Sequence, residues 1–171
     1  ANLIARLNPS SLVFIDGDKF TKSNLNRQIF CSNKTLGQNK SQCAKTILEC
    51  TTNSELIAID KYLTETNIDI LKDMDMVMDD SDNIKEMLLM KNYCAKNNIP
   101  IIHGAINGYF GQVAIIRPNS KIYDTIYSSK TDIPIQSTLS FVPAIIAGFE
   151  VSEMVKYLTN TNPLKDNQIL I

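Results

Sequence analysis

The sequence has 171 residues, of which 44% are hydrophobic and 20% charged, so we predict one domain with a well-buried core over residues 1–171. A formal net charge of −1, from 17 basic and 18 acidic residues, excludes the strong global field that draws proteins to nucleic acid or to anionic membranes. No apolar run reaches the roughly 18 residues of a membrane span and no signal sequence is recognisable, so we predict a cytoplasmic protein.

The first half of the chain alternates short β-branched runs with helix-period segments, which predicts an α/β fold with a mostly parallel sheet. The chain opens with what is interpreted as the second half of a helix, ending before Pro9. Buried strands are expected at residues 11–16, 55–59, 75–79 and 100–103. Helices are expected at residues 37–51, at residues 64–72 with Thr64 as N-cap, and at residues 83–97.

The second half is predicted to begin with a strand at residues 110–116, which Pro118 ends. Residues 119–136 show no period and are expected to form a long crossover loop, a type of segment that is often functional. The apolar spacing over residues 143–158 predicts a helix that has Pro143 in its first turn. A last edge strand is predicted at residues 167–171.

The cysteines and the single histidine indicate no metal centre. The four cysteines are Cys31, Cys43, Cys50 and Cys94. They include no Cys-x-x-Cys pair, and one histidine cannot complete a zinc ligand set, so we predict reduced thiols and no zinc. His103 ends a predicted strand and is interpreted as a buried structural imidazole.

A first polar cluster follows the strand predicted at residues 11–16. Its members are Asp16, Asn24, Arg27, Gln28 and Lys40. Asp16 lies at the strand's carboxyl end, where a carboxylate can accept hydrogen bonds from ribose hydroxyls, although a turn-forming role is the alternative. Arg27 presents a planar fork and Lys40 a mobile point charge, and together they could neutralise a triphosphate. Taken singly, each cation would be interpreted as a solvated surface residue.

A second cluster, Asp79, Asp80 and Asp82, follows the strand predicted at residues 75–79. Ligands of open α/β sheets bind outside the carboxyl ends of the strands, and a carboxylate there could take Mg²⁺ together with phosphate oxygens. Three carboxylates cannot share one ligand without raising a pKa or recruiting a cation. The alternative is that Ser81 or Asp82 caps the next helix. Because the sequence also contains the first cluster, we favour Asp82 as a magnesium ligand.

These motifs follow one another as in the ThiF/MoeB/HesA adenylyltransferases, relatives of the ubiquitin-activating enzymes, which the sequence resembles over nearly all its length. The matching segments are Asp16-Gly-Asp18, Ser23-Asn-Leu-Asn-Arg-Gln28, Gly37-Gln-Asn-Lys40, Asp79-Asp-Ser-Asp-Asn83, His103-Gly-Ala105, Gly108-Tyr-Phe-Gly-Gln112 and residues 141–156. The block from Ser23 to Gln28, with its lysine downstream, is the specific part of the resemblance.

The resemblance implies a Rossmann-like, mostly parallel sheet flanked by helices, and a site for ATP and Mg²⁺. Carried over by motif, Asp16 would bind the ribose, Asn24, Arg27 and Lys40 the triphosphate with Gln28 in support, and Asp82 the magnesium. Asp18 would also belong to the nucleotide-binding residues. Arg27, Lys40 and Asp82 would be the catalytic residues.

The implied reaction joins ATP to the C-terminal glycine of a ubiquitin-like sulfur-carrier protein similar to ThiS or MoaD. The carrier's carboxylate attacks the α-phosphate and yields an acyl-adenylate and pyrophosphate. The resemblance also implies a homodimer. It leaves the carrier open among the thiamine, molybdopterin, cysteine and other sulfur pathways.

Three features depart from the family pattern. The glycine-rich loop and the first strand are missing, residues 123–129 replace an expected Cys-x-x-Cys pair, and residues 119–139 contain no cysteine for a thioester. We therefore expect an adenylate as the product and a Gly-x-Gly-x-x-Gly segment upstream of Ala1 in a longer protein. Another segment, another chain or a rearranged sheet should occupy the place of the missing strand, and this chain should bind ATP more weakly than the longer one.

Two other functions stay open. A catalytically silent dimerisation and docking partner would keep the fold, but it has no chemical need of Asp16, Arg27, Lys40 and Asp82 together. A nicotinamide-dependent dehydrogenase would use Asp16 at the adenosine ribose, but it leaves Arg27 and Lys40 unexplained. Pyrophosphate exchange and nicotinamide fluorescence quenching would separate the adenylyltransferase from the dehydrogenase.

Overall fold

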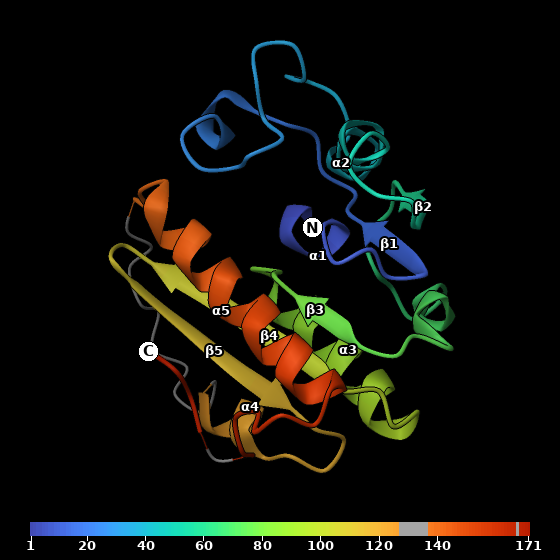
Figure 1. Cartoon of the computed structure of the whole chain (residues 1–171), viewed down its shortest axis with the longest axis vertical. Helices are drawn as coiled ribbons and strands as arrows, with labels where there is room; N and C mark the ends of the chain where they lie inside the picture. The colour runs from blue at the N-terminus through green and yellow to red at the C-terminus, as the bar shows by residue number, and fades with distance from the viewer. Residues whose placement is uncertain (127–136, 167) are drawn as a thin grey trace. The chain divides into compact units, whose positions relative to one another are not determined.

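The computed structural model describes residues 1–126, 137–166 and 168–171, and the chain divides into two compact units, Ala1–Tyr62 and Leu63–Ile171 (Figure 1). Each unit has a sheet of its own, with two strands in the first unit and three in the second. Each unit also has its own cluster of buried apolar side chains.

The first unit is built around one parallel strand–helix–strand crossover. Its elements are α1 (Asn2–Ala5), β1 (Ser11–Ile15), the 3₁₀ helix η1 (Lys22–Asn24), α2 (Lys40–Leu48) and β2 (Glu55–Ile59). β1 and β2 pair in parallel from Ser11 opposite Glu55 to Ile15 opposite Ile59. Such a pair needs a long crossover, and α2 supplies it. Ala5, Leu48 and Leu56 form the buried centre of this unit.

The start of α2 is set by local backbone chemistry. Gly37 has a φ of +79°, a left-handed conformation that glycine adopts readily and that an α-helix cannot contain. Asn39 is the N-cap, and its side chain accepts a hydrogen bond from the Gln42 N–H at 3.0 Å. The helix predicted from residue 37 therefore begins at Lys40.

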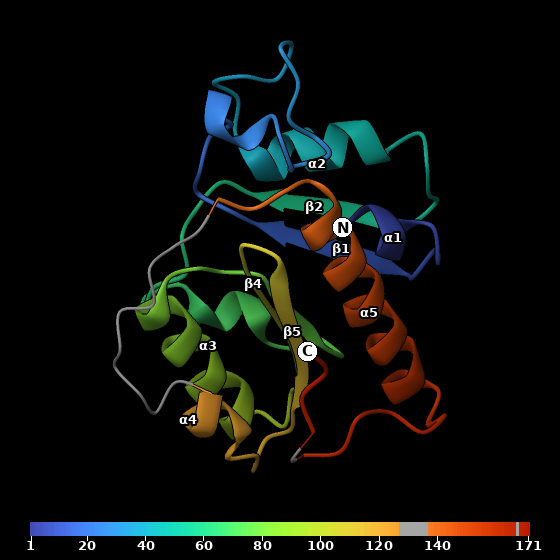
Figure 2. The same ribbon diagram turned by 90° about the vertical axis from the view of Figure 1, so that its left-hand side faces the viewer.

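The second unit has helices on both faces of a three-stranded sheet. Its elements are the 3₁₀ helix η2 (Ile68–Leu71), β3 (Val77–Asp79), α3 (Ile84–Lys96), β4 (Ile101–Asn107), β5 (Phe110–Ile116), α4 (Ile122–Ile126) and α5 (Phe141–Leu158). β3 pairs with β4 in parallel, and β4 pairs with β5 in an antiparallel hairpin. α3 and α5 cover opposite faces of this sheet (Figure 2). Ile102, Val113, Ile115 and Ile146 form the buried core on the α5 side.

The predicted α/β class with mostly parallel pairing is confirmed, because two of the three strand pairs are parallel. The strands form two sheets and not one, because within the described ranges no strand of β1–β2 pairs with a strand of β3–β4–β5. What occupies the place of the strand expected to be missing stays an open prediction.

Several predicted boundaries were wrong. The helix expected at residues 64–72 is only the short η2, because residues 64–67 form a turn in which the Asn67 N–H donates to the Thr64 carbonyl at 3.1 Å, and Asn67 is the N-cap. The strand expected at residues 100–103 continues to Asn107 as an arm of the hairpin. β3 is shorter than predicted and begins at Val77.

The C-terminal predictions were closer. The strand at residues 110–116 is confirmed, and α5 begins at Phe141 with Pro143 in its first turn, as expected. The predicted loop at residues 119–136 contains α4, and its residues 127–136 lie outside the described part. In place of an edge strand at residues 167–171, of which residue 167 is not described, Leu170 makes a single antiparallel bridge to Val113.

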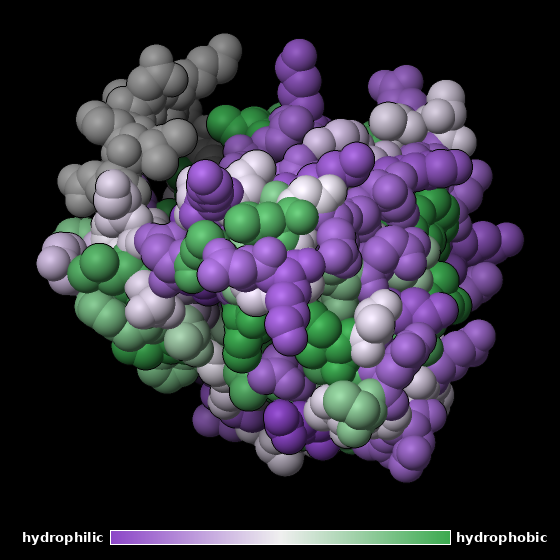
Figure 3. Space-filling view, turned by 90° about the horizontal axis from the view of Figure 1, so that it is seen from above, coloured by the Kyte–Doolittle hydropathy of each residue, from purple (hydrophilic) through white to green (hydrophobic). Residues whose placement is uncertain are grey.

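The surface seen in Figure 3 is mostly hydrophilic, with hydrophobic residues interspersed among the polar ones. Scattered apolar residues are normal on a protein surface and indicate no function by themselves. Among the described residues, no helix is both long enough and apolar enough to span a membrane.

Candidate functional site

The turn that follows β1 carries two of the predicted site residues, Asp16 and Asp18. The Asp16 N–H donates to the Ile59 carbonyl at 3.1 Å, which extends the β1–β2 pairing by one residue. Asp16 Oδ1 accepts the Asp18 N–H at 2.8 Å, so Asp16 does form a turn. Burial is the largest influence on this carboxyl and raises its pKa above the ordinary aspartate value. Oδ2 of Asp16 is not used by the turn and faces Lys40.

Asn39 ties this turn to the start of α2. Its Nδ2 group donates to the backbone carbonyls of Asp16 at 2.9 Å and Asp18 at 3.1 Å, and to Asp60 Oδ1 at 2.5 Å. Its Oδ1 caps the helix, as described above, and its side chain is buried. One side chain thus fixes the ends of β1 and β2 against the N-terminus of α2. The sequence analysis missed Asn39, although an Asn directly before a helix is a common cap.

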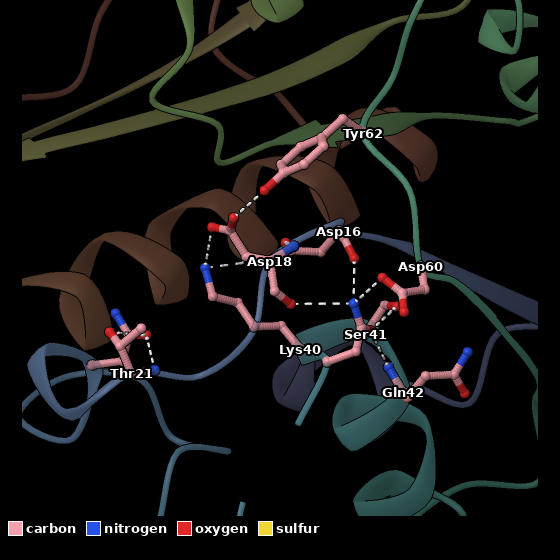
Figure 4. Close-up of polar contacts among 10 residues, drawn as sticks. Asp16, Asp18, Thr21, Lys40, Ser41, Gln42, Asp60 and Tyr62 are labelled. Atoms are coloured by element: carbon pink, nitrogen blue, oxygen red, sulfur yellow. Dashed lines mark hydrogen bonds and ion pairs between the residues drawn. The ribbon is translucent and has the colours of Figure 1, made fainter. Parts of the chain in front are cut away.

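Lys40, the first residue of α2, lies between the two carboxylates (Figure 4). Its Nζ is 2.7 Å from Asp18 Oδ2 and 3.9 Å from Asp16 Oδ2. The hydrogen bond from Lys40 is the largest influence on Asp18, followed by one from Tyr62, and both lower the pKa of this carboxyl. The structure therefore brings together Asp16, Asp18 and Lys40, as the sequence predicted.

Asn24, Arg27 and Gln28 are held within their own loop. Asn24 is buried, and its Oδ1 accepts the Thr21 N–H at 3.0 Å, which caps η1. Arg27 Nη1 donates to the Ser23 carbonyl at 2.8 Å and to Asn26 Oδ1 at 3.1 Å. The Gln28 N–H donates to the Asn24 carbonyl at 2.9 Å. Among described residues, Arg27 makes no bond to Asp16 or Lys40, so its place at a phosphate stays a prediction.

The carboxylates after β3 have different environments. Asp79 is buried, accepts the Ser81 hydroxyl at 2.8 Å and lies 3.1 Å from Nδ1 of the buried His103. His103 is thus a buried imidazole as predicted, although it lies within β4 and not at a strand end. Asp82 is exposed and caps no helix, because the N-cap of α3 is Asn83. The alternative, that Ser81 or Asp82 caps this helix, was therefore wrong.

Glu150 is a buried acid that the sequence analysis did not single out. It is only 3% exposed, and a Cβ added at Gly104 would lie 1.9 Å from its Oε1. Within the described part of the chain, this Oε1 has no hydrogen-bond partner. Burial, followed by the neighbouring Asp80 carboxylate, raises the pKa of Glu150 to about 10. A glutamate inside an apolar helix and a glycine inside a strand were the available signals.

Nowhere in residues 1–126, 137–166 and 168–171 do three or more His, Cys, Asp or Glu side chains form a group that could hold a metal ion. Magnesium commonly needs only one or two carboxylates, because substrate phosphates and water complete its coordination. The exposed Asp82 carboxylate fits that mode of binding. Its role as a magnesium ligand, like the absence of zinc, stays a prediction.

A paired carboxylate and lysine at the carboxyl end of a parallel strand, next to a helix N-terminus, are typical of nucleotide-binding α/β domains. The profile of the ThiF family matches residues 1–170, and this chain belongs to that family. The family membership expected from the motif order is confirmed.

The chain is also similar to curated proteins and to solved structures. The chain is 23% identical to the SAMP-activating enzyme E1 of Haloferax volcanii, over 98% of this chain and 65% of that protein. It is 26% identical to a probable molybdopterin-synthase adenylyltransferase of Gracilaria tenuistipitata var. liui, over 91% of this chain and 46% of that protein. The crystal structure of E. coli MccB shares the fold, with a TM-score of 0.79 and 18% identity over 98% of this chain and 53% of that one. Another MccB structure was solved with ATP. The chain thus spans between about half and two thirds of these proteins.

Proposed function

We propose that this chain is the nucleotide-binding part of an enzyme that uses ATP to adenylate the C-terminal carboxylate of a ubiquitin-like sulfur-carrier protein. The observation that carries the proposal is the placement of the Lys40 ammonium between Asp16 and Asp18 at the end of β1. Membership of the ThiF family and the names of its adenylyltransferase relatives support it. The homodimer and the identity of the carrier stay predictions.

In the proposed reaction, a carboxylate oxygen of the carrier forms a bond to the α-phosphorus of ATP. The bond between that phosphorus and the bridging oxygen to the β-phosphate breaks, and pyrophosphate leaves. No protein side chain has to move a proton, so catalysis rests on in-line placement and on stabilising charge. This suits a site that is rich in fixed charges.

Each predicted residue has a role in this proposal. Asp16 Oδ2 accepts a ribose hydroxyl, and Lys40, whose ammonium has three N–H donors, binds phosphate oxygens while it stays paired with Asp18. Arg27 exchanges its bonds to Ser23 and Asn26 for phosphate oxygens, while Asn24 and Gln28 hold the loop that carries it. Magnesium, bound by Asp82, would neutralise charge on the phosphates.

The test is carrier-dependent exchange of pyrophosphate into ATP by the complete protein, including the segment expected upstream of Ala1. Lys40→Ala and Arg27→Ala should each lower the exchange rate by about two to three orders of magnitude, the scale for losing one preorganised charge. Lys34→Ala, which removes an exposed lysine from the same loop region, should leave the rate unchanged. Near-normal exchange in both the Lys40 and the Arg27 variants would contradict the proposal. Carrier binding without any exchange would favour the docking alternative.

A further inference from the structure

Tyr62 lies against the turn that carries Asp16 and Asp18 (Figure 4). Its hydroxyl donates to Asp18 Oδ1 at 2.5 Å. Its ring packs on the backbone of Gly17, where an added Cβ would lie 2.8 Å from the ring carbons Cδ2 and Cε2. The tyrosine is therefore held at both its ring and its hydroxyl, although 55% of its surface is exposed.

Asp18 joins this tyrosine to Lys40. One of its carboxylate oxygens accepts the Tyr62 hydroxyl and the other accepts the Lys40 ammonium at 2.7 Å. The Asp18 side chain is half exposed, so without a second partner it could rotate and carry the ammonium with it. The ring of Tyr62 packs on Gly17, and this contact holds the hydroxyl in place, so that its bond to Asp18 limits the rotation. The bond from Tyr62 thus acts on Lys40 through Asp18.

The charges around Asp18 favour the ionised carboxylate that the link from Tyr62 to Lys40 requires. Lys40, Tyr62 and the Asp16 carboxylate face it, and Asp60 faces Asp16 on the far side of the turn. Both Lys40 and Tyr62 lower the pKa of Asp18, so it is ionised at neutral pH and can hold the lysine.

We propose that Tyr62 is a positioning residue, which fixes Asp18 so that Lys40 is already ordered beside the nucleotide site when ATP arrives. The inference rests on the proposed function. A lysine that is ordered in advance loses less conformational freedom on binding, and the gain is seen mainly as affinity for ATP. In this role Tyr62 acts on Lys40 through Asp18.

Tyr62→Phe keeps the ring on Gly17 and removes only the hydroxyl. We expect it to weaken MgATP binding about fivefold, the effect of one hydrogen bond of about 1 kcal/mol, while kcat for pyrophosphate exchange changes less than about twofold. The same substitution in an Asp18→Asn background should have no further effect, because the link is already broken. The control is Tyr109→Phe, an exposed tyrosine at the β4–β5 turn, which should bind MgATP like the wild type.

A second measurement does not depend on ATP. Carboxyl-carbon NMR should show a higher pKa for Asp18 in Tyr62→Phe than in the wild type, and no change in Tyr109→Phe. An unchanged Asp18 pKa, or equally tight MgATP binding by Tyr62→Phe, would overturn the positioning role even if the enzyme is active. Absence of MgATP binding by the complete wild-type protein would overturn the proposed function, and the role of Tyr62 in it, whatever the NMR result.

Discussion

Glu150 shows how one buried residue can make the stability of the fold depend on pH. Its pKa is raised to about 10, mainly by burial in the second unit, from an ordinary value of 4.5. Between these two values the folded chain holds one proton more than the unfolded chain. The free energy of unfolding therefore decreases as pH rises through this window, at a limiting slope of about 1.4 kcal/mol per pH unit.

Glu150→Gln should reduce this slope, because glutamine has nearly the same shape and stays neutral at every pH. We expect the free energy of unfolding of the wild type to fall more steeply than that of the variant between about pH 5 and about pH 9. Urea unfolding at a series of pH values measures both slopes. Glu49→Gln, which changes an exposed glutamate, should behave like the wild type. Parallel curves for wild type and Glu150→Gln would show that Glu150 is ionised in the folded chain.

At the scale of elements, the two long helices that follow strands begin with asparagine caps in different surroundings. The side chain of Asn83 is exposed and accepts hydrogen bonds from the Lys85 and Glu86 N–H groups of α3. Asn39 is buried, and besides capping α2 it donates to three acceptors at the ends of β1 and β2. The first cap stabilises one helix, whereas the second also holds the turn that carries Asp16 and Asp18.

Alanine substitutions should separate these two roles. Asn83→Ala should lower the stability of α3 by about 1 kcal/mol, as for an ordinary cap. Asn39→Ala should lower that of α2 by about 2 to 3 kcal/mol, because it also removes the hydrogen bonds from Asn39 to Asp16, Asp18 and Asp60. Hydrogen exchange of the amides in each helix measures the two effects. Equal losses would mean that the bonds from Asn39 to the strand ends add nothing to stability.

The elements that sequence reasoning located well have signals within their own segment. β5 is a continuous apolar run ended by a proline, and α3 combines helical spacing with Asn83 at its start. The segment at residues 64–72 was misjudged because Thr64 and Asn67 close a turn with hydrogen bonds between their own backbone and side-chain groups, which delays the start of η2 to Ile68. Local patterns are reliable when no side chain offers the backbone another partner.

The candidate site could be predicted only in part. Asp16, Asp18 and Lys40 were found because their types and order form a recognisable motif. Tyr62 was not found, because its role depends on a contact to Asp18, 44 positions earlier in the sequence. Asn39 likewise reaches Asp16 across 23 positions. Such contacts arise only when β1, α2 and β2 are folded together, so no local pattern reports them.

At the scale of the whole molecule, the four cysteines are distributed over both units and differ in solvent accessibility. Cys31 and Cys43 are buried in the first unit and Cys94 in the second, whereas Cys50 is exposed. Burial raises the pKa of Cys43, and it raises that of Cys94 to about 12. Thiol reagents attack the thiolate, so buried thiols with raised pKa values react slowly.

A native protein should therefore show one fast thiol. We expect Ellman's reagent to label Cys50 at least tenfold faster than the other three, and all four to react at similar rates in denaturant. Cys50→Ser should abolish the fast phase without changing the slow one. Two or more fast thiols in the native state would mean that one of the buried cysteine sites opens readily.

The close approach of Gly104 and Glu150 also restricts how this sequence can change over generations. A methyl group at position 104 would come within 2.4 Å of Glu150 Cδ, so replacement of the glycine alone creates a clash inside the second unit. A lineage that first acquires a shorter residue at position 150 escapes this clash and can then accept alanine at position 104. The reverse order passes through a strained intermediate. Positions 104 and 150 should therefore covary among related sequences, and substitutions at position 150 should precede those at position 104.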